Sequence, residues 1–140
     1  MINELDSTVV AYRFDTGSGT LHPFQVVSAL ADDFIANSRG SEIAVSPDGR
    51  HVYASNRGAD TVATFAVDRA SGRLTLTGSS PAGGKTPRFF TLTADGATMF
   101  VANEEGHNIV RHAIDPRSGL PLKPVVVAET GSPTSVLLSG

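Results

Sequence analysis

The chain has 140 residues, of which 40% are apolar, 18% charged and 6% aromatic, and this predicts a folded, soluble domain with a core of small aliphatic side chains. It contains no Cys, which excludes disulfides, thiol catalysis and thiolate-bound metals. The net charge of −3 comes from interspersed acidic and basic residues, without the basic stripe of a nucleic-acid or anionic-membrane binder, so the expected partner is a small molecule.

Three copies of the hairpin signature Asp-x-x-Ser-Gly divide the chain into repeats. The copies begin at Asp15, Asp68 and Asp115, at spacings of 53 and 47 residues. Each follows a run of strand-forming residues, at 8–14, 61–67 and 108–114. A repeat of about fifty residues built from short strands predicts a β-propeller, whose blades are four-stranded antiparallel sheets.

Residues 1–40 contain less than one blade. Asn3 lies 53 residues before Asn56, which ends a second strand in the next repeat, so the chain opens inside a second strand. The run at 8–14 then supplies a third strand. We expect residues 1–40 to form an incomplete blade without its first strand.

Residues 41–84 and 85–130 each contain a full blade. The strands expected in the first of these segments are 41–46, 51–56, 61–67 and 73–78. The strands expected in the second are 88–93, 98–103, 108–114 and 122–128. Pro47-Asp48-Gly49 and Ala94-Asp95-Gly96 supply the tight turns after the two first strands.

Residues 131–140 resemble the start of one more blade. Pro133 stands 46 residues after Pro87, and 134–138 reads as a first strand that would close a ring. A closed propeller needs at least four blades. We therefore expect the chain to be the C-terminal part of a longer propeller, or several copies to assemble one.

A β-sandwich is the alternative to the propeller, because its short strands also come at regular spacing. Its strands should alternate apolar and polar residues, since one face of each sheet meets solvent. The run at 61–67, Thr-Val-Ala-Thr-Phe-Ala-Val, is instead apolar on both faces. This favours a sheet packed between two other sheets.

Several motifs, in order along essentially all 140 residues, resemble the seven-bladed propeller lactonases, the family of bacterial 6-phosphogluconolactonase and fungal 3-carboxymuconate cyclase. The motifs are Asn3-Glu4-Leu5, the run at 41–49, Tyr53 to Gly58, Thr86 to Phe90, and Val101 to Glu104. The resemblance implies a hydrolase of carbohydrate metabolism that opens or closes a lactone in a central cleft without a metal or other cofactor. It also implies a carboxylate for proton transfer and arginines for an anionic substrate. A cytoplasmic location is the default expectation.

Four residues are candidates for these roles. Glu4, in Asn-Glu-Leu, and Glu42, on an innermost strand, are the candidate acid or base, because lactone hydrolysis needs a group that activates water and protonates the leaving oxygen. Arg57 and Arg88 are the candidate anion-binding residues. Glu4 has a structural alternative as a solvated carboxylate at a strand end, and Arg57 has one as a turn residue paired with Asp60. A charge on the innermost strand is costly unless it faces the central channel or finds a partner, which favours a functional role for Glu42.

Two other functions stay open from the sequence. A propeller that binds proteins without catalysis is one, although the few aromatic residues argue against it. A metal-dependent propeller lactonase, with Asn56, Asn103 and carboxylates around calcium, is the other. Because half of the cleft would lie outside these 140 residues, we expect the chain alone to be inactive.

Overall fold

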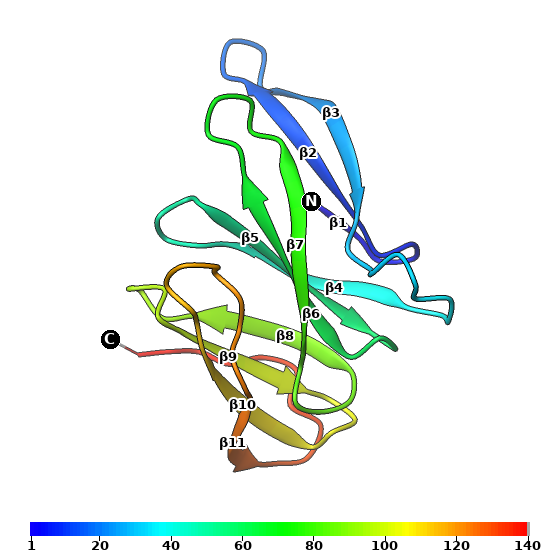
Figure 1. Ribbon diagram of the computed structural model, residues 1–140, viewed down its shortest axis with the longest axis vertical. Helices are drawn as coiled ribbons and strands as arrows, with labels where there is room; N and C mark the ends of the chain where they lie inside the picture. The colour runs from blue at the N-terminus through cyan, green and yellow to red at the C-terminus, as the bar shows by residue number, and fades with distance from the viewer. Residues whose placement is uncertain (140) are drawn as a thin grey trace.

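The computed structural model describes residues 1–139, which form strands and turns and contain no helix. No helix in this range could therefore span a membrane. The strands form three antiparallel sheets, each built from one contiguous segment of the chain (Figure 1). The first sheet, in the order β1-β2-β3, contains β1 (Ile2–Asn3), β2 (Thr8–Asp15) and β3 (Thr20–Ser28).

The second and third sheets have four strands each. The second, in the order β4-β5-β6-β7, contains β4 (Arg39–Val45), β5 (His51–Arg57), β6 (Thr61–Val67) and β7 (Leu74–Pro81). The third, with β8 at one edge and β11 at the other, contains β8 (Pro87–Leu92), β9 (Thr98–Asn103), β10 (Asn108–Ala113) and β11 (Val125–Glu129). The predicted all-β architecture of four-stranded propeller blades is confirmed.

The boundaries differ from the predicted ones by a few residues. The second sheet begins at Arg39 rather than at 41, because Arg39 and Gly40 pair with the end of β5. Residues 130–139 form no strand, so the closing strand at 134–138 stays a prediction. Ser132 nevertheless has a left-handed φ of 45°, as Thr86 has (58°) at the equivalent position before β8.

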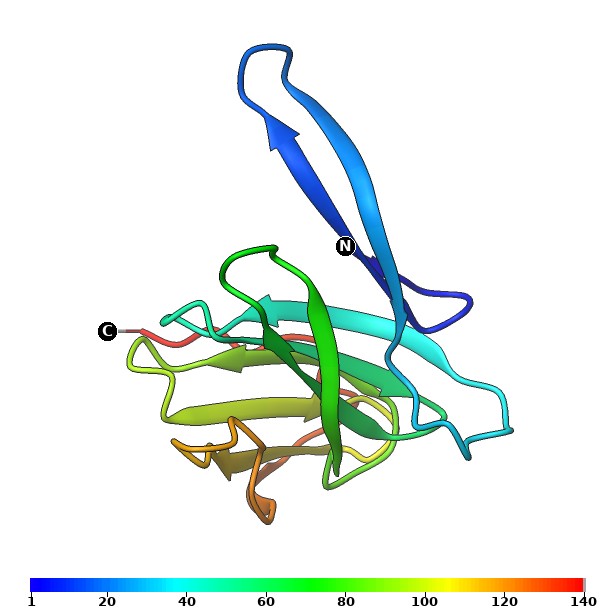
Figure 2. The same cartoon turned by 45° about the horizontal axis from the view of Figure 1, so that its top comes forward.

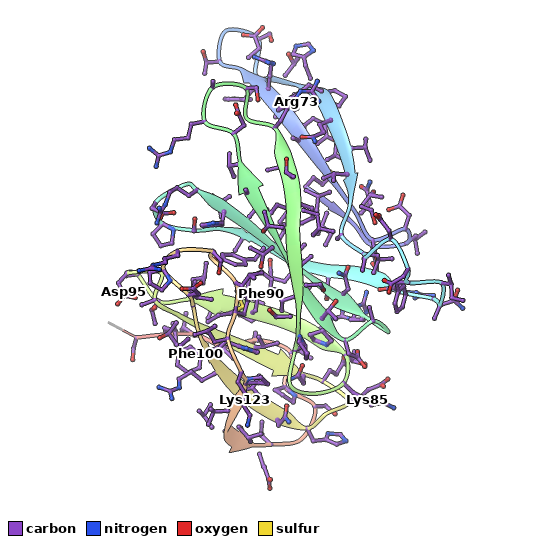
Figure 3. The ribbon with its side chains drawn as sticks, viewed as in Figure 1. Arg73, Lys85, Phe90, Asp95, Phe100 and Lys123 are labelled. Atoms are coloured by element: carbon purple, nitrogen blue, oxygen red, sulfur yellow. The ribbon has the colours of Figure 1, made fainter. Side chains whose placement is uncertain are left out.

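The second sheet buries both of its faces, as its sequence predicts. One core cluster joins it to the first sheet and contains Phe65, Val52 and Val9. The other joins it to the third sheet through Tyr53 and Phe90, whose rings meet edge to face at 6.5 Å. Phe90 is labelled in Figure 3. A sheet covered on both faces by neighbouring sheets excludes the β-sandwich.

The three sheets contact one another along their inner strands. β1 lies against β4, and β4 lies against β8. At the outer side β3 contacts β7, where the Gln25 side chain bonds both backbone groups of Leu74, each at 2.8 Å. Beyond that contact, the tip of the β2–β3 hairpin projects from the rest of the molecule (Figure 2).

Buried asparagines tie each sheet to the sheet before it. Asn56 at the end of β5 is fully buried, and its Nδ2 donates to the Ala29 carbonyl of the preceding segment at 2.7 Å. Asn103 at the end of β9 repeats this bond to the Ala82 carbonyl at 3.2 Å. Asn3 holds the same position in the first sheet, but its Nδ2 bonds locally to Thr8 Oγ1. The repeat therefore includes an inter-sheet hydrogen bond as well as a strand pattern.

The three Asp-x-x-Ser-Gly signatures form hairpin turns, as predicted. In each turn the Asp carboxylate accepts hydrogen bonds from backbone N–H groups two and three residues later. These bonds lower the pKa of each carboxyl below its ordinary value, together with a bond from the turn serine. The closing glycines adopt φ near +70°, a conformation that side chains disfavour. The signature is therefore explained by turn chemistry alone.

We predict that Asn56→Ala destabilises the chain by about 1–3 kcal/mol, because it leaves the Ala29 carbonyl buried without a partner. Asn3→Ala is the matched control, since Asn3 is only half-buried and bonds within its own turn. Denaturant unfolding of the two variants measures the difference. Equal losses for both would show that the inter-sheet bond contributes nothing specific.

Candidate functional site

Three of the four candidate residues, Glu4, Arg57 and Arg88, gather at one end of the sheets, here called the site face. It consists of the turns after the second strands, at 4–7, 58–60 and 104–107, and of the connections between sheets, at 29–38 and 82–86. Lys85 marks this end of the third sheet, and Asp95 marks the opposite end (Figure 3). A pocket at the opposite end, lined by turn residues such as Pro47 and Asp95, holds none of the four candidates.

Each sheet places one charged side chain at the same position on the site face, directly after the repeated asparagine. These residues are Glu4, Arg57 and Glu104, at the repeat spacings of 53 and 47. The turns behind them are also equivalent, because Ser7, Asp60 and His107 all have φ between 51° and 53°. The repeat therefore places Glu, Arg and Glu in turn at equivalent positions of successive sheets.

Glu4 and Arg57 form an ion pair between the first and second sheets. Arg57 Nη2 donates to Glu4 Oε1 at 2.5 Å, and the same nitrogen lies 3.4 Å from the Gly40 carbonyl. The Arg57 side chain is only 15% exposed, whereas that of Glu4 is 56% exposed. The hydrogen bond and the charge of Arg57 lower the pKa of Glu4 below its ordinary value. Glu4 is therefore a deprotonated, solvent-accessible carboxylate at neutral pH.

A cavity of about 280 Å³ opens beside this pair. Its lining comes from all three sheets: Ile2, Glu4, Gly40, Ser41, Arg57 and Arg88. Gly40 lets β1 approach β4 closely at this cavity, because a Cβ there would lie 2.7 Å from the Ile2 side chain and 2.9 Å from the Asn3 carbonyl. We call this cavity the inner chamber. It brings together three of the four residues that the sequence singled out.

Arg88 is the more accessible cation of the inner chamber. Its side chain is 48% exposed, and its Nη1 is 4.0 Å from Glu104 Oε2, a loose contact in comparison with the Glu4–Arg57 pair. Its place at the chamber follows from a β-bulge, which shifts the β8 register between Pro87 and Phe89. Arg88 is therefore free to bind an anion.

Glu42 lies on β4 but does not line the inner chamber. A bulge between Gly40 and Ile43 removes Glu42 from the regular β4–β5 pairing, so its N–H donates to Ser55 Oγ at 3.0 Å. Its own carboxylate accepts a hydrogen bond from the Ile43 N–H at 2.9 Å. The structure therefore separates Glu42 from the other three candidates.

The structural alternative for Arg57 is wrong, because its partner is Glu4 and not Asp60. Asp60 Oδ1 instead accepts hydrogen bonds from the backbone of its own turn, at Gly58, and from Thr86 in the next connection. The spacing could have revealed the true pair, since Glu4 and Arg57 are one repeat apart. What the sequence could not reveal is that equivalent residues of adjacent sheets touch.

Asn56 and Asn103, the candidate calcium ligands, have a structural role instead. Asn56 and Asn103 are fully buried, and their amides bond to backbone carbonyls of the neighbouring segment. Within residues 1–139, no three His, Asp or Glu side chains are arranged to hold a metal ion. The observed role of both asparagines is to join the sheets.

Comparison with known proteins gives one consistent result. The family described as "Lactonase, 7-bladed beta-propeller" matches residues 1–138. The 6-phosphogluconolactonase of Bacillus subtilis is 38% identical over 129 residues, which are 91% of this chain and 37% of that protein. The 6-phosphogluconolactonase of Formosa agariphila is 36% identical over 121 residues, 84% of this chain and 33% of that protein.

Solved structures agree with the sequence matches. The periplasmic gluconolactonase PpgL of Pseudomonas aeruginosa superposes with a TM-score of 0.86 at 32% identity, over 94% of this chain and 36% of its own. A Lactobacillus plantarum protein gives 0.86 at 31% identity, over 92% and 38%. The chain thus spans about a third of the length of the relatives that it matches. Because PpgL is described as periplasmic, the cytoplasmic location stays a prediction.

We predict that Arg57→Met raises the pKa of Glu4 towards its ordinary value of 4.5, because it removes the hydrogen bond and charge that lower it most. The wild-type carboxylate should therefore remain ionised to a lower pH than the variant's. A pH titration of the Glu4 side-chain carboxyl carbon by NMR measures this. Arg39→Met is the control and should shift the pKa less, since Arg39 has a smaller effect on Glu4. An unchanged Glu4 titration in Arg57→Met would contradict the ion pair.

Proposed function

The chain belongs to the seven-bladed β-propeller lactonase family, and we propose on this basis that it forms part of a hydrolase acting on a sugar-derived lactone that carries a negative charge. The observation that supports this most directly is the inner chamber, where a carboxylate and two guanidinium groups meet. An accessible carboxylate can transfer protons, and guanidinium groups can hold a carboxylate or phosphate. These are the needs of lactone hydrolysis on an anionic substrate.

Glu4 is proposed to move the proton in this reaction. The water oxygen bonds to the lactone carbonyl carbon while Glu4 accepts one of its protons. The bond from that carbon to the ring oxygen then breaks, and the proton on Glu4 passes to the ring oxygen, which gives the open hydroxy acid. Because Arg57 lowers the pKa of Glu4, the carboxylate begins deprotonated and returns the proton readily.

The two arginines are proposed to have different roles. Arg57 is largely buried and engaged with Glu4, so it positions the carboxylate and contributes positive charge beside the reacting carbonyl. Arg88 is half-exposed and only loosely paired, so it binds the substrate at its reacting end, where ring opening produces a carboxylate. Glu104 would then release Arg88 when the substrate enters.

The rest of the cleft is proposed to come from further blades, in a longer protein or from other copies of the chain. The outer faces of the first and third sheets are suited to such packing, because they expose large apolar side chains. Phe14 and Val26 are 62% and 64% exposed on the first sheet, and Val125 is 50% exposed on the third. Exposed apolar patches on a soluble sheet indicate interfaces.

We predict that Glu4→Gln lowers kcat for lactone hydrolysis by about 10²–10⁴-fold, the usual contribution of a general acid or base. The assay measures acid release from the lactone by the complete propeller that contains this chain, because residues 1–140 alone are expected to be inactive. Glu129→Gln, an equal change on exposed β11, is the control for loss of charge.

Glu42→Gln separates the two candidate carboxylates in the same assay. Glu42 lies outside the inner chamber and bonds to Ile43. We therefore expect Glu42→Gln to lower kcat much less than Glu4→Gln does. A larger loss for Glu42→Gln than for Glu4→Gln would transfer the proton-transfer role to Glu42.

A further inference from the structure

A second cavity, of about 500 Å³, lies on the site face next to the inner chamber. We call it the outer chamber; the lining residues that matter here are Asn37, Ser38, Arg39, Arg57, Thr86 and Glu105. Arg57 lines both chambers, so they adjoin across its side chain. A ligand whose reacting group lay beside Glu4 could extend past Arg57 into this space.

One wall of the outer chamber is formed by the connection between β3 and β4, which is longer than its equivalent in the next repeat. The connection from β3 to β4 has ten residues, 29–38, whereas the equivalent connection from β7 to β8 has five, 82–86. This difference accounts for most of the change in repeat spacing from 53 to 47. Insertions in repeat proteins commonly fall on the binding face. The longer connection therefore builds a feature that the next repeat lacks.

The long connection is fixed in place beside the candidate site. Ser38 Oγ donates to the Arg57 carbonyl at 3.1 Å and accepts from Ser7 Oγ at 3.2 Å. At Gly58, which has a φ of 96°, an added Cβ would lie 2.5 Å from the Asn37 carbonyl, so the two backbones are in close contact. The wall of the outer chamber is thus tied to the turns that carry Glu4 and Arg57.

Arg39 is the cation of the outer chamber that is available to a ligand. Its side chain is exposed, and it forms no ion pair with any residue in 1–139. Arg57 is engaged by Glu4, and Glu105 adds one carboxylate to the lining. Hydroxyl and amide groups of Ser38, Thr86 and Asn37 complete a polar lining around Arg39.

We propose that the outer chamber binds the hydroxylated, anionic tail of the lactone, with Arg39 as the anion-binding residue. This inference rests on the proposed function, because it places the reacting carbonyl beside Glu4. A sugar lactone carries its carbonyl at one end and its terminal oxygen at the other. Relatives are named both for phosphorylated and for unphosphorylated gluconolactones, which differ in the charge of that tail. Arg39 therefore determines which of the two this site prefers.

The test compares Arg39→Gln with wild type on 6-phosphogluconolactone and on gluconolactone. We expect kcat/KM to fall about tenfold to hundredfold for the phosphorylated lactone and less than twofold for the other, as loss of one charge-assisted contact would cause. The control is Arg73→Gln, the same change on an exposed arginine of the β6–β7 hairpin, at the far end of the second sheet (Figure 3). Arg73→Gln should leave kcat/KM unchanged for both lactones.

Binding is measured in parallel, so that the inference is tested even without turnover. The probes are 6-phosphogluconate and gluconate, titrated into the purified chain. The phosphorylated acid should bind wild type more tightly, and Arg39→Gln should remove that preference. Equal losses on both lactones, or an unchanged preference in the variant, would overturn the role of Arg39. A complete propeller containing this chain that binds the phosphorylated acid but hydrolyses neither lactone would overturn the proposed function and leave the anion site standing.

Discussion

The hydrogen bond from a buried asparagine to the backbone of the preceding sheet is the interaction on which the site depends. Asn56 donates to the Ala29 carbonyl and Asn103 to the Ala82 carbonyl, in both cases away from water. A buried carbonyl without a hydrogen-bond partner destabilises the fold, so each bond fixes the position of one sheet relative to the next. The residue that follows the asparagine is thereby held at the rim between two sheets. This bond positions the Arg57 side of the Glu4–Arg57 contact, whereas Glu4 follows Asn3, whose amide bonds within its own turn.

Much of the fold follows from local patterns in the sequence. The Asp-x-x-Ser-Gly turns, the Pro-Asp-Gly turn and the doubly apolar run at 61–67 each have a chemical reason to form where they do. The strands β5 and β9 accordingly begin where the repeat predicts. What the pattern could not supply is the behaviour of residues 134–138, because a strand exists only when an edge is present for it to pair with.

The site was less predictable than the fold. Glu4, Arg57 and Arg88 were identified, but the distances among them depend on two β-bulges that no periodicity shows. The bulge in β4 also moved Glu42 out of its expected place, since a one-residue irregularity changes which side chain faces the cavity. Arg39 escaped notice because it lies at the boundary between a loop and a strand. Its surroundings come from a connection whose path sequence alone does not determine.

In this repeat the asparagine has a structural role and the residue after it contributes charge to the site. This separation of roles affects how the specificity of such a protein could change in evolution. Asn56 and Asn103 are buried and join the sheets, while the residue that follows the repeated asparagine, at positions 4, 57 and 104, is Glu, Arg and Glu in turn. A substitution at that following residue alters the charge presented to a ligand without disturbing the joint beneath it. Evolution could therefore exchange one specificity for another, a blade at a time, on an unchanged scaffold.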